Sequence, residues 1–266
     1  EGVATNNLGL VLTDQGDYVR ALKHYRQALD LFRQIGDRRN EVLPLANLGW
    51  ILAGLGDHVR SREYFEQGLQ LTREVGNQSH ECGILSNLGW LHHLTGDNEK
   101  ALDYSRQALS LAQTIGSQRW EGYALINVGH SQAGLGRLAE AAEAYRQSLD
   151  LRREIGQHQL AMDALASLAQ VHLAEGNLDR ALTQVEEILA FEDAHGLDGT
   201  EEPLRIYLSC VQVLQAANDP RAGEVLDTAY RKLQKRAARI DDEALRRSFL
   251  ENVPAHREII EAWEIK

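Results

Sequence analysis

The sequence predicts an all-α fold in which helix–turn–helix units stack side by side into a solenoid. Glycines recur every 40 residues in three separate columns, and apolar residues between them recur every three or four positions, as on one face of a helix. A spacing shared by three columns over five units indicates an internal repeat. The columns are Gly9, Gly49, Gly89 and Gly129; Gly16, Gly56, Gly96, Gly136 and Gly176; and Gly36, Gly76, Gly116, Gly156 and Gly196.

The first helix of each unit carries the first glycine column inside its apolar face. In the second unit Leu45, Leu48, Leu52 and Leu55 follow helical spacing, and Gly49 lies among them. Glycine inside a helix costs about 1 kcal/mol relative to alanine. We therefore expect a neighbouring helix to pack closely against the position that lacks a side chain.

The other two glycine columns mark the ends of helices. Glycine can end a helix in the left-handed conformation, and an aspartate that follows it can cap the start of the next helix. One such hairpin cannot bury its own apolar face, so the units must stack. The second helix of the first unit carries the apolar stripe Ala21, Tyr25, Ala28, Phe32 and Ile35, and the cap column is Asp17, Asp57, Asp97, Arg137 and Asn177.

This pattern resembles the tetratricopeptide repeat in Leu8-Gly9, Gly16-Asp17, Ala21, Tyr25 and Ala28. The 40-residue period, longer than the usual period of about 34, is similar to that of kinesin light chains, Pins-type adaptors and large bacterial regulators. The resemblance implies a right-handed α-α superhelix whose first helices line a concave groove for peptide segments. Five units are expected, at about 1–40, 41–80, 81–120, 121–160 and 161–200.

Beyond residue 200 the pattern weakens. We expect a degenerate sixth unit at 201–240, and a closing helix at 241–266 that is broken near Pro254 and caps one continuous domain. The only methionine is Met162, and residues 248–259 are similar to the endings of large bacterial proteins. We therefore expect the chain to be the C-terminal part of a bacterial multidomain regulator.

An asparagine column on the groove side of the first helices is the leading candidate binding feature. Asn7, Asn47, Asn87 and Asn127 lie 40 residues apart, and asparagine is unfavourable inside a helix. Its amide can pair with both the N–H and the C=O groups of a bound strand, and grooves of the Pins and kinesin light chain type use such a ladder. The alternative is that each amide bonds to the neighbouring unit.

Aromatic residues extend the same face. Trp50 and Trp90 lie one turn beyond two of the asparagines, and Tyr123 and His130 continue the stripe in the fourth unit. Tryptophan is enriched among the residues that dominate binding energy at interfaces. The alternative is that these rings pack between adjacent first helices.

Charge points to the kind of partner. The net charge is −11, which excludes bulk binding to nucleic acid. Glu41, Glu81 and Glu121 recur at the starts of first helices, either to complement the helix dipole or to attract a basic or neutral partner segment. The expected partner is therefore an extended protein or peptide segment.

No motif for chemistry is recognisable, and we expect neither catalysis nor a metal or cofactor. The adjacent His92 and His93 point about 100° apart on a helix and cannot chelate together. Two distant cysteines and the lack of a long apolar run favour a cytoplasmic protein without membrane contact. Two hypotheses remain, a peptide-binding module and a structural or autoinhibitory arm that contacts its own protein or a second copy.

Overall fold

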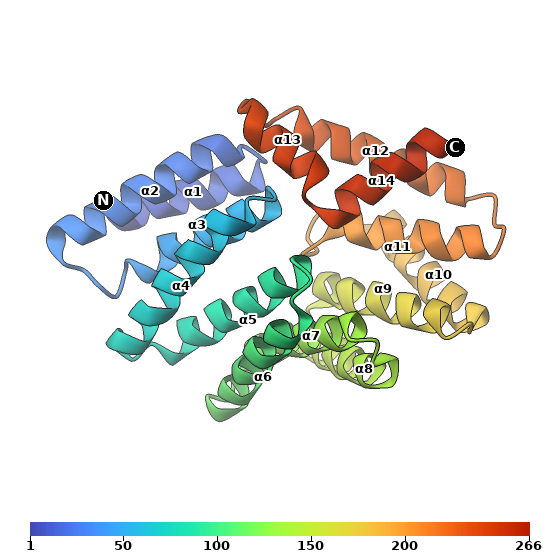
Figure 1. The fold of residues 1–266 in the computed structure, drawn as a ribbon, viewed down its shortest axis with the longest axis horizontal. Coiled ribbons are helices and arrows are strands. Elements are labelled where there is room, and N and C mark those ends of the chain that lie inside the picture. Colours follow the sequence, from blue (N-terminus) through green and yellow to red (C-terminus); the bar gives the residue numbers. More distant parts are fainter.

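The computed structural model describes residues 1–266 and contains fourteen helices and no strand. Consecutive helices pair as hairpins that curve around a common centre (Figure 1). The predicted all-α superhelical repeat fold is confirmed. The hairpins are α1 (Gly2–Asp14) with α2 (Tyr18–Ile35), α3 (Val42–Gly54) with α4 (His58–Val75), α5 (Gln78–Leu94) with α6 (Asn98–Thr114), α7 (Gln118–Gly134) with α8 (Leu138–Glu154), α9 (His158–Ala174) with α10 (Leu178–His195), and α11 (Pro203–Ala216) with α12 (Ala222–Ala237).

The first glycine column marks where the two helices of a unit touch. A side-chain carbon added to Gly49 of α3 would lie 2.6 Å from the ring of Phe65 on α4. In the first unit Tyr25 of α2 has the role of Phe65: a side-chain carbon added to Gly9 of α1 would lie 2.6 Å from the ring of Tyr25. The close approach expected from the sequence is present, and in these two units an aromatic ring fills the space that glycine leaves free.

The turn between α3 and α4 follows the expected capping pattern. Gly56 has a φ of 78°, in the left-handed region, and the Asp57 side chain accepts a hydrogen bond from the backbone N–H of Arg60 at 3.2 Å. These two features end one helix and start the next within three residues. Asp17, Asp97 and Asn177 cap their helices in the same way, whereas Arg137 makes no side-chain cap.

Stacking of the units buries one side of each first helix. Leu48 of α3 and Leu88 of α5 are fully buried between consecutive units. Leu8 occupies the same place in α1, where no unit packs over it, and is 45 % exposed. The apolar core therefore follows the contacts between units rather than the composition of each helix.

The recurring acidic residues at the starts of first helices pair with the preceding unit. Arg73 of α4 contacts Glu81 of α5 at 2.8 Å, and Gln113 of α6 donates to Glu121 of α7 at 3.0 Å. Glu41 is buried and lies 3.6 Å from Arg33. Polar groups of the previous helix therefore engage these carboxylates, and attraction of a basic or neutral partner segment by them stays a prediction.

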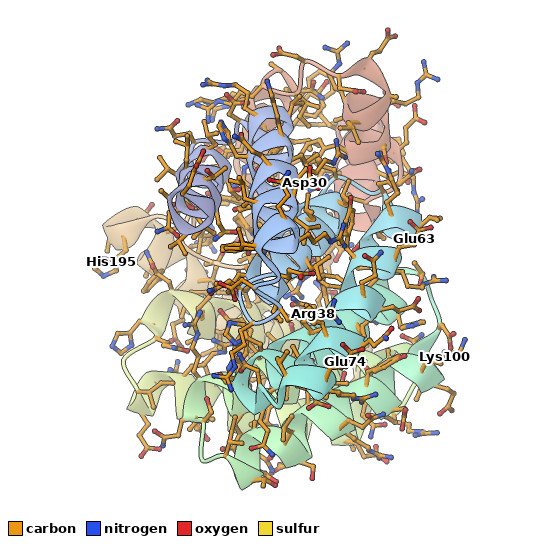
Figure 2. The ribbon with its side chains drawn as sticks, turned by 90° about the vertical axis from the view of Figure 1, so that its left-hand side faces the viewer. Asp30, Arg38, Glu63, Glu74, Lys100 and His195 are labelled. Carbon is orange, nitrogen blue, oxygen red and sulfur yellow. The ribbon has the colours of Figure 1, made fainter.

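The outer surface of the ring is polar and charged. Asp30, Glu63 and Lys100 lie on this side (Figure 2), where Arg38 and Glu74 also form an ion pair between the first two units. No helix combines the length and the apolar character that crossing a membrane requires.

The C-terminal segment forms two helices, with the break near Pro254 that the sequence predicts. α13 (Glu243–Glu251) and α14 (Pro254–Ile265) are separated at Pro254, which takes the first position of α14 as proline prefers. α14 packs on α12, where the rings of Tyr230 and Trp263 stack with centroids 4.1 Å apart. This part of the segment caps the last hairpin.

The other part of the segment closes the array into a ring. Arg239, just after α12, donates to the backbone carbonyl of Gln15 at 2.7 Å. Asn252, just after α13, donates to the carbonyl of Gly56 at 3.4 Å, and Ser248 lies against the same glycine. The segment from Arg239 to Asn252, which includes α13, thus returns to the turns of the first two hairpins (Figure 1).

Candidate functional site

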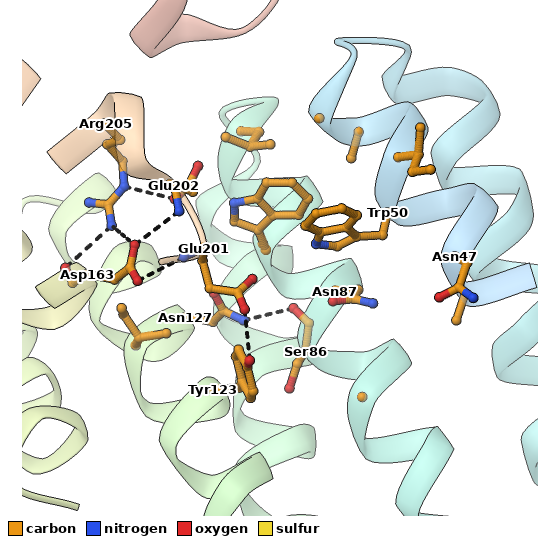
Figure 3. A pocket seen from close by; sticks show the side chains of 18 of the residues that line it. Asn47, Trp50, Ser86, Asn87, Tyr123, Asn127, Asp163, Glu201, Glu202 and Arg205 are labelled. Carbon is orange, nitrogen blue, oxygen red and sulfur yellow. Dashed lines mark hydrogen bonds and ion pairs between the residues drawn. The ribbon is translucent and has the colours of Figure 1, made fainter. Parts of the chain in front are cut away.

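A cavity of about 750 Å³ lies on the inner side of the ring (Figure 3). The first helices α3, α5 and α7 line one side of it, and residues 201–205 line another. Phe249 of α13 and His256 of α14 also contribute to the lining. A volume of this size is usual for pockets that take small ligands.

The residues predicted to form the groove converge on this cavity, with one exception. Asn7 is exposed on α1, and no residue of α1 lines the cavity. The other seven predicted residues, Asn47, Trp50, Asn87, Trp90, Tyr123, Asn127 and His130, all line it.

The asparagine column divides into engaged and free members. The Asn127 amide donates to the backbone carbonyl of Ser86 at 2.9 Å, and the Asn47 amide donates to the side chain of Asn6 at 3.2 Å. Both bonds join a unit to the one before it, as the alternative hypothesis predicted. Asn87 is half-buried at the cavity wall and makes no side-chain hydrogen bond within the chain. The column therefore does not form a uniform ladder.

The indoles offer open surface to the cavity. Trp50 is 38 % exposed and Trp90 is half-buried, and neither indole N–H donates a hydrogen bond within the chain. A third indole, Trp120, also lines the cavity and packs where Gly83 has no side chain. The sequence signal for this third ring is Gly83. The equivalent positions of the neighbouring units hold the larger residues Leu43 and Tyr123, and the absence of a side chain at Gly83 leaves room for Trp120.

Tyr123 and His130 are held in place by other side chains. The Tyr123 hydroxyl donates to Glu201 at 2.8 Å, and its ring lies 4.4 Å from the guanidinium carbon of Arg152. His130 is buried, its Nδ1 lies 2.8 Å from the hydroxyl of Tyr145, and burial holds its pKa well below the usual value. His130 therefore supports the cavity wall as a neutral ring, and it exposes less surface to a ligand than the indoles do.

A charged cluster that the repeat pattern does not predict forms the other side of the cavity. The Asp163 carboxylate accepts hydrogen bonds from the backbone N–H groups of Glu201 at 3.1 Å and Glu202 at 3.2 Å. The guanidinium of Arg205 donates to Glu202 at 2.8 Å and lies 3.9 Å from Asp163. Burial raises the pKa of Asp163 to about 7, although Arg205 opposes the shift. A lone aspartate in the apolar sequence of α9 was the signal for this cluster.

The curved stack of hairpins and the cavity on its inner side define a helical repeat protein. Sequence models of the tetratricopeptide repeat match residues 2–74, 55–114 and 120–191, and the chain belongs to this family. A comparison with curated protein sequences finds no match.

Three solved structures illustrate the similarity of the fold. A Rap protein complexed with Competence and Sporulation Factor aligns with a TM-score of 0.68 and 18 % identity, over 98 % of this chain and 75 % of that one. NprR in complex with its cognate peptide NprX aligns with a TM-score of 0.64 and 15 % identity, over 92 % and 73 %. Aspartyl phosphate phosphatase F from Bacillus subtilis aligns with a TM-score of 0.70 and 14 % identity, over 98 % and 66 %. At these identities the likeness shows the fold alone.

Proposed function

We propose that the chain is a non-catalytic interaction module that binds an extended peptide or protein segment in the central cavity. The observation that carries this proposal is the wall formed by Trp50, Asn87 and Trp90, whose polar groups have no partners within the chain. Aromatic surface with free N–H groups and a free amide suits a ligand that has both side chains and a main chain to bind. Two structural neighbours, NprR in complex with its cognate peptide NprX and the Rap conjugation gene regulator of plasmid pLS20 in complex with the Phr* peptide, add support.

The absence of a catalytic role is part of the proposal. Two ionisable groups at the cavity are tied to structural partners, since backbone N–H groups cap Asp163 and Tyr145 engages His130. A general acid or base needs to reach a substrate, and these groups already serve the fold. The larger regulator, the cytoplasmic location and contact with a second copy stay predictions.

The rival hypothesis, a structural or autoinhibitory arm, expects the cavity to be filled from within the same molecule. The terminal helices do line the cavity, through Phe249, Val253 and His256, yet a volume of about 750 Å³ stays free. The free volume favours an external ligand over an internal one.

Affinity selection from a pool of random hexapeptides tests the proposal. The immobilised chain is incubated with the pool, retained peptides are identified by mass spectrometry, and the dissociation constant of each is measured by calorimetry. We expect the double variant Asn87→Ala, Trp50→Ala to weaken binding about tenfold or more, because tryptophan commonly supplies a large share of the binding energy at an interface and the variant also removes the free amide. Retention of the same peptides with equal affinity by a variant of unchanged melting temperature contradicts the proposal.

The matched control is Trp263→Ala. This tryptophan is 40 % exposed, close to the 38 % of Trp50, but it lies on α14 outside the cavity. The control removes an indole of similar exposure and should leave peptide affinity unchanged.

A further inference from the structure

Four residues form a continuous polar patch on the cavity wall, which we call the acceptor subsite: Ser86, Tyr123, Asn127 and Glu201. Tyr123 and Asn127 are one turn apart on α7 and so lie on the same face. Tyr123 donates to Glu201 at 2.8 Å, and Asn127 donates to the carbonyl of Ser86 at 2.9 Å. All four residues line the cavity, and the labels in Figure 3 show them grouped together.

The hydrogen-bonding capacity left over in this subsite consists mostly of acceptors. The Asn127 amide donates one N–H to the carbonyl of Ser86, and its oxygen accepts no bond within the chain. One oxygen of the Glu201 carboxylate accepts from Tyr123, and the carboxylate forms no ion pair with an arginine or lysine. The Ser86 hydroxyl is buried, at 2 % exposure of the residue, and has no partner.

A buried polar atom without a partner costs free energy. The group that satisfies several acceptors at once, one of them a carboxylate, is a cation with several N–H donors. Indole faces, which attract cations, line the same cavity at Trp50 and Trp90.

We propose that the acceptor subsite binds a primary ammonium or guanidinium group of the peptide ligand, with Glu201 as its counter-charge. This inference rests on the proposed peptide-binding function and adds the chemical group that the ligand must carry. The group is either the free N-terminal ammonium of the peptide or the side chain of a lysine or arginine.

Three arginines near the acceptor subsite oppose the binding of a cation, although none of them donates a hydrogen bond to the residues of the subsite. Arg152 lies against the ring of Tyr123 and donates to Gln157 at 3.1 Å. Arg205 pairs with Glu202, and Arg119 is exposed at the start of α7. Their positive charges weaken the electrostatic attraction of Glu201 for a cation. Hydrogen-bond geometry must therefore act together with charge in selecting the ligand group.

Four pools of random hexapeptides test the inference. The first has free N-termini and lacks lysine and arginine, and the second is N-acetylated with one lysine or arginine. The third is N-acetylated and uncharged, and the fourth is N-acetylated with one glutamate. We expect the first or the second pool to be retained about tenfold more than the third, since charge-assisted hydrogen bonds are stronger than neutral ones. Which of the two is retained identifies the source of the cation.

Glu201→Gln should remove this preference while leaving the uncharged pool unaffected. Glu143→Gln, a charge-matched change on the outer surface of α8, should leave the preference intact. Should Glu201→Gln lower the melting temperature, Ser86→Ala provides a second variant: it deletes a hydroxyl that bonds nothing, so the fold should be unchanged while retention of the cationic pool falls about threefold or more.

Equal retention of the uncharged and cationic pools would overturn the inference and leave the proposed function standing. Preferential retention of the glutamate pool would also overturn it. If no pool binds better to the chain than to its Asn87→Ala, Trp50→Ala variant, the proposed function fails instead.

Discussion

The two sides of the cavity differ in origin and in chemistry. The side formed by α3, α5 and α7 comes from equivalent positions of successive units and presents neutral groups, among them Trp50 and Asn87, that have no partners. The side formed by Asp163, Glu202 and Arg205 depends on the irregular segment before α11, and its charged groups satisfy one another. The repeated side is therefore available to a ligand, whereas the irregular side is mainly committed to the fold.

Removal of Asp163 should have the largest effect on stability. Asp163→Ala leaves the backbone N–H groups of Glu201 and Glu202 without their acceptor and Arg205 without one of its two carboxylates. We expect the free energy of unfolding to fall by about 3–5 kcal/mol, because two backbone N–H groups lose their hydrogen-bond acceptor at once. Chemical denaturation measures it, and a loss below about 1 kcal/mol would mean that this side is not committed to the fold.

Acid should weaken the ring at its closing end. Burial lowers the pKa of His256 to about 4, while its Nδ1–H donates to the carbonyl of Phe249 at 2.7 Å. Because the unfolded chain binds a proton near pH 6.5 and the folded chain does not, the stabilisation from this histidine is complete above pH 6.5 and lost as pH falls toward 4. The expected loss is about 3 kcal/mol.

The variant His256→Phe isolates this contribution. It should reduce the difference in unfolding free energy between pH 7 and pH 4.5 by about 2 kcal/mol, because the phenyl ring cannot take up a proton. Asp163 acts with the opposite sign, since its raised pKa makes it destabilising as pH rises from 4 to 7. An unchanged pH dependence in His256→Phe would show that the closing helices do not exclude the charged imidazole.

A helix end in the repeated part should be moderately sensitive. Gly76 has a φ of 68° and no atoms nearby that a side chain would meet, so only the backbone conformation opposes substitution. Gly76→Val should cost about 1–2 kcal/mol in thermal or chemical unfolding, because a β-branched residue strongly disfavours the left-handed region. Gly54→Ala is the control, since Gly54 is helical with open space around it, and the change should be neutral or stabilising.

The smallest effect on stability is expected at the ligand-facing side. Asn87→Ala removes an amide that bonds nothing within the chain, so the free energy of unfolding should change by less than about 0.5 kcal/mol. A loss above about 1.5 kcal/mol in the same unfolding assay would place Asn87 in the fold rather than at the cavity surface, and would remove the contrast between the two sides.

The sequence predicts the repeated side well because each unit repeats the same physical solution. The packing of Gly49 against Phe65 and the cap at Asp57 follow from residue types at fixed spacing. The cluster at Asp163 could not be derived, since its partners lie in a segment outside the 40-residue period. Ring closure could not be predicted from the sequence either, because Arg239 and Gln15 are distant in sequence and no periodicity connects them.

Ring closure fixes how many hairpins the array can hold. An open solenoid tolerates gain or loss of a unit, because each unit contacts only its neighbours. Here Asn252 must meet Gly56, and one added hairpin would shift the two ends by about 10 Å for each packed helix. Duplication of a 40-residue segment would then break the ring closure and disrupt the cavity. This architecture can therefore diversify by substitution but not by the addition of repeat units.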